Sequence, residues 1–150
     1  MTTAAGFDLG PDGPGTLVVG VDGSDTSWRA LYYAFGVARR QHATVLAVFA
    51  VPTPIAFGND GIVVGAIAEA NEQLADELRP AIQTLAVDFR VRAEFICRVG
   101  DPGIMLVQVA QEHHADALIV GASQALIHQV FPSNAIRAVR RCRCPVTVVP

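Results

Sequence analysis

The sequence contains no lysine, and all eleven of its basic residues are arginine. This absence excludes Schiff-base chemistry, which needs a lysine amine, and phosphate binding by a P-loop, which needs a lysine beside its glycines. Mechanisms that depend on a lysine are therefore not available to this chain.

Features of membrane and secreted proteins are also missing. No apolar run reaches the roughly 18–20 residues that a membrane span needs, and the N-terminal residues lack the basic start and apolar block of a signal peptide. The three cysteines are an odd number at uneven spacing, which is typical of free thiols in a reducing compartment. We expect a soluble cytoplasmic protein with no membrane partner.

Charge is sparse in this chain. Only 17% of the residues are charged, the net charge is −3 and the isoelectric point is about 5.7. A nucleic-acid or anionic-membrane surface would need a concentration of positive charge. The sequence therefore predicts no nucleic-acid partner.

The length and composition predict one compact domain. Of the 150 residues, 51% are hydrophobic, and a chain of this length buries roughly 68–70% of its unfolded surface without a disulfide or metal. Residues 1–15 are rich in glycine and proline toward their end and show no apolar periodicity. We interpret residues 1–15 as a flexible tail and residues 16–150 as the domain.

Five short apolar runs predict strands. They are Thr16–Val21, Ala43–Val51, Arg90–Val99, Ala117–Val120 and Val146–Val149. Between them the sequence predicts helices after Ser24, over about Ala66–Asp88, from Pro102 to about His113, and over Ser133–Arg141. Strict alternation of strands and helices is typical of an α/β fold, an open parallel five-stranded sheet with helices on both faces. The partly alternating run Arg90–Val99 indicates an edge strand.

The apolar spacing predicts which face of each helix lies inward. In the first helix the inward positions are Trp28, Leu31, Phe35 and Ala38, and in the second they are Ala70, Leu74, Leu78, Ala81 and Leu85. Pro80 should kink the second helix or divide it in two. The preceding segment, Thr53–Gly65, is the longest irregular stretch, and we interpret it as a plain connection, with a lid as the alternative.

Turn residues follow the first and fourth strands, where a ligand would bind such a sheet. Asp22, Gly23 and Ser24 follow the first strand, while Gly121 and Ser123 end the fourth. Ligands of open parallel sheets lie beyond the carboxyl ends of the strands, where the strand order reverses. If the first strand is central, both turns meet at one crevice, although each glycine could simply make a tight turn.

Four blocks of the chain resemble the universal stress protein family. They are VVGVDGS near the start, RVGDP before the third helix, ADALIVGAS at the fourth strand and CPVTVVP at the end, in the order that the family has. The resemblance covers about residues 16–150. It implies a sheet of strand order 3-2-1-4-5, as in adenine nucleotide alpha-hydrolase-like folds, and in many members a homodimer formed through the last strand.

The resemblance also implies a nucleotide site, because one group of members binds ATP through a glycine motif. That motif is a glycine, two residues, a second glycine, nine residues, and a third glycine followed by serine or threonine. Gly121 matches its first position, but Gln124 stands at the second glycine. Read without gaps, the third position falls on Asn134-Ala135, whereas alignment on the following helix places Pro132-Ser133 there.

The implied nucleotide-binding residues come from both halves of the chain. Asp22 matches the acidic residue near the ribose, Ala50 and Val51 end the second strand where adenine would lie, and Ser133 can donate a hydroxyl hydrogen bond. The full candidate set is Val21, Asp22, Ala50, Val51, Gly121, Ser123, Gln124, Ser133 and Asn134. ATP is the ligand that the resemblance suggests, and no catalytic or metal-binding residue is predicted.

Two functional hypotheses remain open beside a non-catalytic, ATP-binding stress-response regulator. One is a nucleotide-free interaction module of the same fold, in which Gln124 and apolar loop residues fill the crevice. The other is an enzyme of the related adenine-nucleotide α-hydrolase group, but such enzymes need cationic or histidine motifs at the first turn, and VDGSDTS has none. A response-regulator receiver is excluded because it needs a lysine late in the chain.

Two further features remain at the end of the chain. Cys142 and Cys144 stand among arginines, which lower thiol pKa values, so a redox role stays open, whereas two thiols are too few for a zinc site. We interpret them as two packed or half-exposed cysteines that flank a helix end. The last strand is short and apolar, with Val146 and Val148 on a free edge, which predicts a homodimer.

Overall fold

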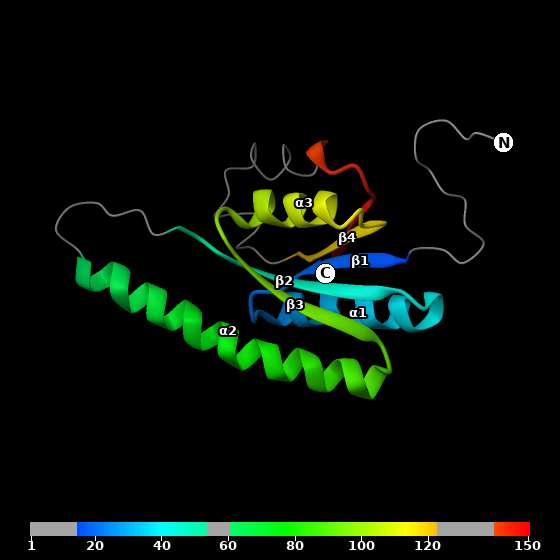
Figure 1. Cartoon of the computed structure of the whole chain (residues 1–150), viewed down its shortest axis with the longest axis horizontal. Helices are drawn as coiled ribbons and strands as arrows, with labels where there is room; N and C mark the ends of the chain where they lie inside the picture. Colours follow the sequence, from blue (N-terminus) through cyan, green and yellow to red (C-terminus); the bar gives the residue numbers. More distant parts are fainter. Residues whose placement is uncertain (1–14, 54–60, 123–139) are drawn as a thin grey trace.

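The computed structural model describes residues 15–53, 61–122 and 140–150, which form one layered α/β domain (Figure 1). The described elements are β1 (Thr16–Gly20), α1 (Asp25–Gln41), β2 (Thr44–Val51), α2 (Gly61–Phe89), β3 (Arg92–Val99), α3 (Pro102–Glu112), β4 (Ala117–Gly121) and β5 (Val146–Val149). The predicted tail before Gly15 lies outside the described residues. So does the predicted helix Ser133–Arg141, apart from Arg140 and Arg141, which are helical.

The sheet confirms the predicted fold. Its strand order is β3-β2-β1-β4-β5, and each neighbouring pair is parallel. β1 is central, and the order reverses between β1 and β4, because the chain builds β2 and β3 on one side before it crosses to the other. β3 lies at one edge with alternating exposed and half-buried residues, as the partial alternation predicted.

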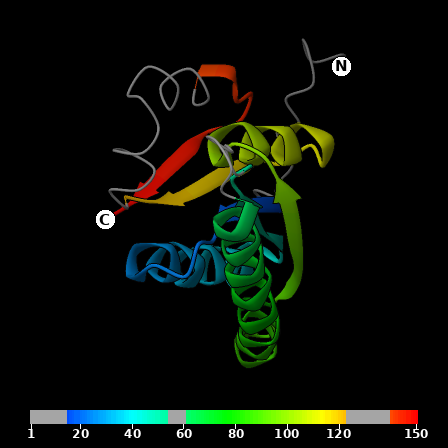
Figure 2. The same cartoon turned by 90° about the vertical axis from the view of Figure 1, so that its left-hand side faces the viewer.

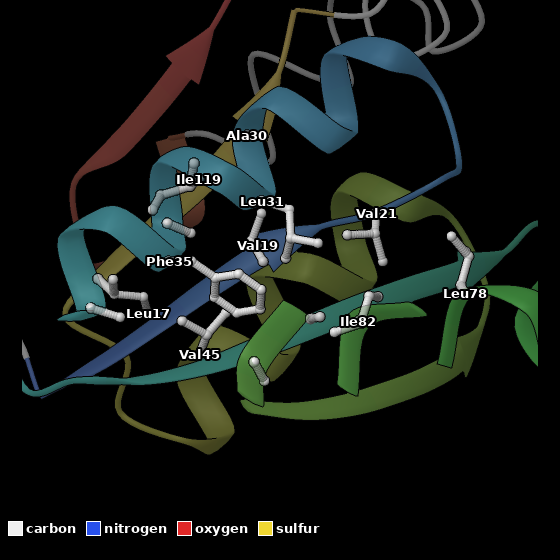
Figure 3. Close-up of a cluster of buried hydrophobic side chains, with 14 of the residues drawn as sticks. Leu17, Val19, Val21, Ala30, Leu31, Phe35, Val45, Leu78, Ile82 and Ile119 are labelled. Atoms are coloured by element: carbon white, nitrogen blue, oxygen red, sulfur yellow. The ribbon is translucent and has the colours of Figure 1, made fainter. Parts of the chain in front are cut away.

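The helices cover the two faces of the sheet unequally. α1 and α2 lie on one face and α3 on the other, with the sheet between them (Figures 1 and 2). The larger core lies under α1 and α2 and includes Leu31 and Phe35, both fully buried (Figure 3). The smaller core, under α3, joins Leu106 and Val109 to the opposite side of β1, β2 and β4. Among the described helices, none combines the length and the hydrophobicity that a membrane span requires.

Caps at both ends fix where α1 begins and stops. The Ser24 hydroxyl oxygen accepts a hydrogen bond from the Ser27 N–H at the N-terminus. His42 has a left-handed backbone conformation at the C-terminus, and its N–H donates to the Ala38 carbonyl. These caps place the N-terminus of α1 directly after the carboxyl end of β1.

The predictions for α2 need two corrections. Division at Pro80 is wrong, because α2 is one helix that passes through this residue. Pro80 is exposed, whereas Leu78 and Ile82 on either side of it are buried, so packing on both sides holds the helix together across the missing N–H. Ala70 and Ala81 are also exposed rather than inward. Leu78 is buried as predicted, and Leu74 and Leu85 are half-buried against the same core. The other fully buried positions are Ala75, Ile82 and Ala86.

Helix α2 begins earlier than predicted. Residues 54–60 lie outside the described part of the chain, and the helix already begins at Gly61. The predicted connection Thr53–Gly65 therefore overlaps the first turn of α2. The choice between a plain connection and a lid also falls outside the described residues.

Candidate functional site

Five of the nine predicted site residues lie together at the carboxyl ends of β1, β2 and β4, at one end of the sheet. These residues are Val21, Asp22, Ala50, Val51 and Gly121. Pairing between β1 and β4 stops at Val19 with Ile119, although both strands continue beyond that pair. The other four, Ser123, Gln124, Ser133 and Asn134, lie outside the described residues. The described part of the site is the half contributed by β1, β2 and the end of β4.

Asp22 is held by a network of hydrogen bonds in the turn between β1 and α1. Its Oδ1 accepts from the Ser24 N–H at 2.9 Å and from the Ser24 hydroxyl at 2.5 Å. The Ser27 hydroxyl donates to the Ser24 carbonyl at 2.9 Å and accepts from the Asp22 N–H at 3.3 Å. Gly23 sits between them with a φ of +81°, a conformation that glycine adopts without strain. The carboxylate is thereby fixed in position while it stays exposed at the carboxyl end of the sheet.

Gly121 is required where it stands by close packing against α1. A Cβ atom on this residue would lie 2.6 Å from the carbonyl carbon and oxygen of Thr26 and 2.9 Å from the Ser27 nitrogen. These distances are far below van der Waals contact, and the atoms belong to the backbone, which cannot rotate away. Gly121 therefore lets the first turn of α1 lie directly against the end of β4, beyond the point where β4 stops pairing with β1.

Ala50 presents unpaired backbone groups at the same end of the sheet. The Val48 carbonyl accepts from the Val21 N–H at 2.9 Å, so Val48 faces β1, and Ala50, two residues later, faces the same side. Pairing of β1 with β2 ends at Gly20 and Val48, and within the described residues neither the N–H nor the C=O of Ala50 has a backbone partner. A ligand beside β1 can therefore meet one donor and one acceptor from a single residue.

Val51 plays a different part from Ala50. Its carbonyl accepts from the Gly100 N–H at 2.8 Å, so the backbone groups of Val51 face β3, whereas those of Ala50 face the β1 side. Its half-buried side chain packs against the larger core. Val51 thus supports the end of β2 and adds apolar surface, whereas Ala50 carries the polar groups.

The distribution of charge indicates where an anionic group could lie. The N-terminus of α1 carries positive partial charge, but Asp22 and Asp25 both stand there. Two carboxylates oppose an anion next to this turn, so the turn itself does not favour a phosphate. In the described residues no group of three histidine, cysteine, aspartate or glutamate side chains could hold a metal ion.

The predicted site set missed the residues that shape its turn. Ser27 is buried, with 4% of its surface exposed, and Thr26 and Ser27 form the surface against which Gly121 packs. Part of this was readable in the sequence, because a serine three residues before Ser27 at a helix start is typical of an N-cap. The contact with Gly121 joins residues almost a hundred positions apart and carries no local signal.

Comparison with known proteins identifies the class to which this chain belongs. The family model for the universal stress protein family matches residues 15–150. The chain belongs to the universal stress protein family. Universal stress protein MJ0531 of Methanocaldococcus jannaschii is 27% identical over 143 residues, which cover 89% of this chain and 80% of the relative.

Solved structures share this fold. A protein of the universal stress protein family from Burkholderia pseudomallei superposes with a TM-score of 0.68 at 26% identity, covering 94% of this chain and 98% of its own. A universal stress protein in complex with cAMP superposes with a TM-score of 0.70 at 24% identity, covering 91% of this chain and 97% of its own.

Proposed function

We propose that this chain is a non-catalytic regulator of the stress response. It binds ATP or another adenine nucleotide at the carboxyl ends of β1, β2 and β4. The observation that carries the proposal is Ala50, whose N–H and C=O extend past the end of β1 without a backbone partner in the described residues. Adenine places an amino donor beside a ring-nitrogen acceptor, so one backbone donor and one acceptor match its edge.

Asp22 supplies the second contact in this proposal. Its Oδ1 is occupied by Ser24, and no described residue donates to its Oδ2. Ribose hydroxyls are hydrogen-bond donors, and a fixed carboxylate accepts them more strongly than a neutral oxygen does. With adenine at Ala50 and ribose at Asp22, the phosphate groups extend toward Gly121 and the segment after it, to which Ser123, Gln124, Ser133 and Asn134 belong.

The cAMP complex of a related protein supports an adenine nucleotide as the ligand. A role without catalysis is supported by the side chains at the carboxyl end of β1, where the described carboxylates are Asp22 and Asp25. Asp22 is already engaged by Ser24, and Asp25 lies in the first turn of α1. The free thiols of the chain further suit a protein of a reducing cytoplasm.

The alternative is a nucleotide-free interaction module of the same fold. It differs from the proposal only in whether the carboxyl end of the sheet is occupied, and the residues that would fill it, Gln124 and the loop after it, follow Gly121. An adenine-nucleotide α-hydrolase would instead consume its ligand. The three functions differ in two measurable properties. The regulator binds a nucleotide without hydrolysing it, the interaction module binds none, and the enzyme binds and hydrolyses ATP.

A calorimetric titration tests the proposal. Protein purified without added nucleotide is unfolded to release and identify any co-purified adenine nucleotide, and nucleotide-free protein is then titrated with AMP, cAMP and ATP. We expect saturable binding of at least one of them and no change in ATP concentration over hours. No heat with any of the three, and no co-purified nucleotide, favours the interaction module, whereas steady ATP loss favours the enzyme.

We further propose that the protein forms a homodimer through β5. The β4–β5 hydrogen bonds from the Leu118 N–H to Pro145 and from the Ala122 N–H to Val149 direct the backbone of alternate residues toward β4. Val146 and Val148 therefore direct their N–H and C=O groups to the open edge, and Val148 is 56% exposed. We expect a dimer mass at micromolar concentration and a monomer mass for Val148→Arg. A wild-type monomer under these conditions contradicts the dimer.

A further inference from the structure

A pair of thiols lies at the end of the sheet opposite to the candidate nucleotide site. Cys142 and Cys144 stand between helical Arg141 and the first residue of β5, where the chain bends at Arg143 and Cys144. The bend turns both side chains to the same side, and their Sγ atoms lie 3.2 Å apart. Each side chain is half-buried and packs against the smaller core. The two sulfur atoms are thus held in contact by the fold and remain accessible.

The surroundings of this pair form a shallow cavity. The cavity of about 470 Å³ is lined by both cysteines, by Arg143 and by residues of the α3 C-terminus and the segment after it, among them Gln111, His114 and Asp116. The Gln111 Nε2 donates to the Arg141 carbonyl at 3.1 Å and ties the bend to α3. A small oxidant can therefore reach the sulfur atoms, while the backbone on both sides of them is anchored.

From this geometry we propose that Cys142 and Cys144 form a redox-active dithiol that a hydroperoxide such as hydrogen peroxide converts reversibly into an intramolecular disulfide. Cys97 does not take part, because it lies on β3, at the edge of the sheet opposite to β5. The nucleotide site and the dithiol occupy opposite ends of the sheet, so the proposal does not depend on nucleotide binding.

The reaction has two balanced steps. The Cys142 thiolate attacks one oxygen of the peroxide, the O–O bond breaks, and protonation gives a sulfenic acid on Cys142 and one water. The Cys144 sulfur then attacks the Cys142 sulfur, the S–O bond breaks, and the thiol proton leaves with the hydroxyl group as a second water. Two thiols and one peroxide thus become one disulfide and two waters.

The surroundings assign the two roles. Burial, together with the hydrogen bond to Cys142, raises the pKa of Cys144 to about 12, so this thiol keeps its proton near neutral pH and suits the resolving step. Cys142, which lines the same cavity, is then the thiol that attacks the peroxide. A disulfide that spans one intervening residue closes a small, strained ring, and strained disulfides are the ones that cellular dithiols reduce readily.

Alkylation after peroxide treatment tests the dithiol. Reduced full-length protein at micromolar concentration is treated with hydrogen peroxide, its remaining thiols are blocked with N-ethylmaleimide, and it is digested with trypsin, which cuts after Arg141 and Arg143. We expect only Cys97 to be alkylated and the peptide Cys142-Arg143 to be disulfide-linked to Cys144–Pro150. Because linked groups have millimolar effective concentrations, this disulfide should exceed intermolecular ones by at least about hundredfold.

Single serine variants provide the controls. Cys144→Ser should stop at the sulfenic acid on Cys142, which dimedone traps, and Cys142→Ser should give neither disulfide nor trapped Cys144. Cys97→Ser should form the disulfide as the wild type does, and dithiothreitol should restore both thiols. Alkylation of all three cysteines after peroxide, or a disulfide found chiefly between two chains, overturns the proposal.

Discussion

Gly121→Ala is expected to destabilise the protein by about 1–3 kcal/mol, the range typical of overpacked cores. The added Cβ would lie 2.6 Å from the Thr26 carbonyl group, so either α1 or β4 must move. Both elements belong to the centre of the fold, and β4 pairs with β1 and β5. Urea unfolding should show a lower midpoint with an unchanged slope.

Gly65→Ala is the matched control for this substitution. Gly65 is an exposed residue within α2, and a Cβ added there meets no atom within 4 Å. Alanine is favoured over glycine in a helix by about 1 kcal/mol, so this variant should be stabilised slightly. If Gly121→Ala is as stable as the wild type, the close packing of α1 on β4 described above is wrong.

Asp22→Ala is expected to weaken binding of an adenine nucleotide by about 10- to 100-fold. Hydrogen bonds to charged groups contribute about 1.5–3 kcal/mol, and each 1.4 kcal/mol corresponds to a tenfold change in affinity. The measurement is the calorimetric titration of nucleotide-free protein. A ligand whose ribose contacts Asp22 must lose this contribution when the carboxylate is removed.

Two variants separate the loss of a ligand contact from damage to the turn. Asp22→Asn keeps an oxygen that can accept from the Ser24 N–H and so keeps the turn, but it removes the charge. It should fold as the wild type does and still bind more weakly. Asp88→Ala removes an exposed carboxylate near the C-terminal end of α2, at the opposite end of the sheet, and should leave affinity unchanged. Equal affinities for Asp22→Ala and the wild type exclude Asp22 from the site.

The fold was predictable from the sequence because its signals are local and mutually consistent. Apolar runs such as that of β2 have no polar alternation, which indicates strands covered on both faces, and Asp101 followed by Pro102 marks the start of α3. Element order and the resemblance to the family then gave the strand order. Which alanines of α2 face the core was not predictable in the same way, since alanines occur on several of its faces and only packing selects Ala75 over Ala70.

The candidate site was predictable only in part. Asp22 and Gly121 were identified as turn residues after strands, and the parallel sheet brings them to one edge. The packing of Gly121 on Thr26 and the free backbone groups of Ala50 are consequences of strand register and of the point where β1 ends. Both features join residues that are far apart in the sequence. No short stretch of sequence therefore reveals them.

An amide-resolved NMR titration of the wild-type protein with AMP shows whether an adenine nucleotide binds at the carboxyl ends of β1, β2 and β4. We expect saturable chemical-shift changes that are largest at the amides of Asp22, Ala50 and Gly121, with little change at Cys142 and Cys144 on the opposite end of the sheet. Saturable changes confined to residues away from the carboxyl ends of β1, β2 and β4, or no changes at millimolar AMP, ATP and cAMP, would contradict it.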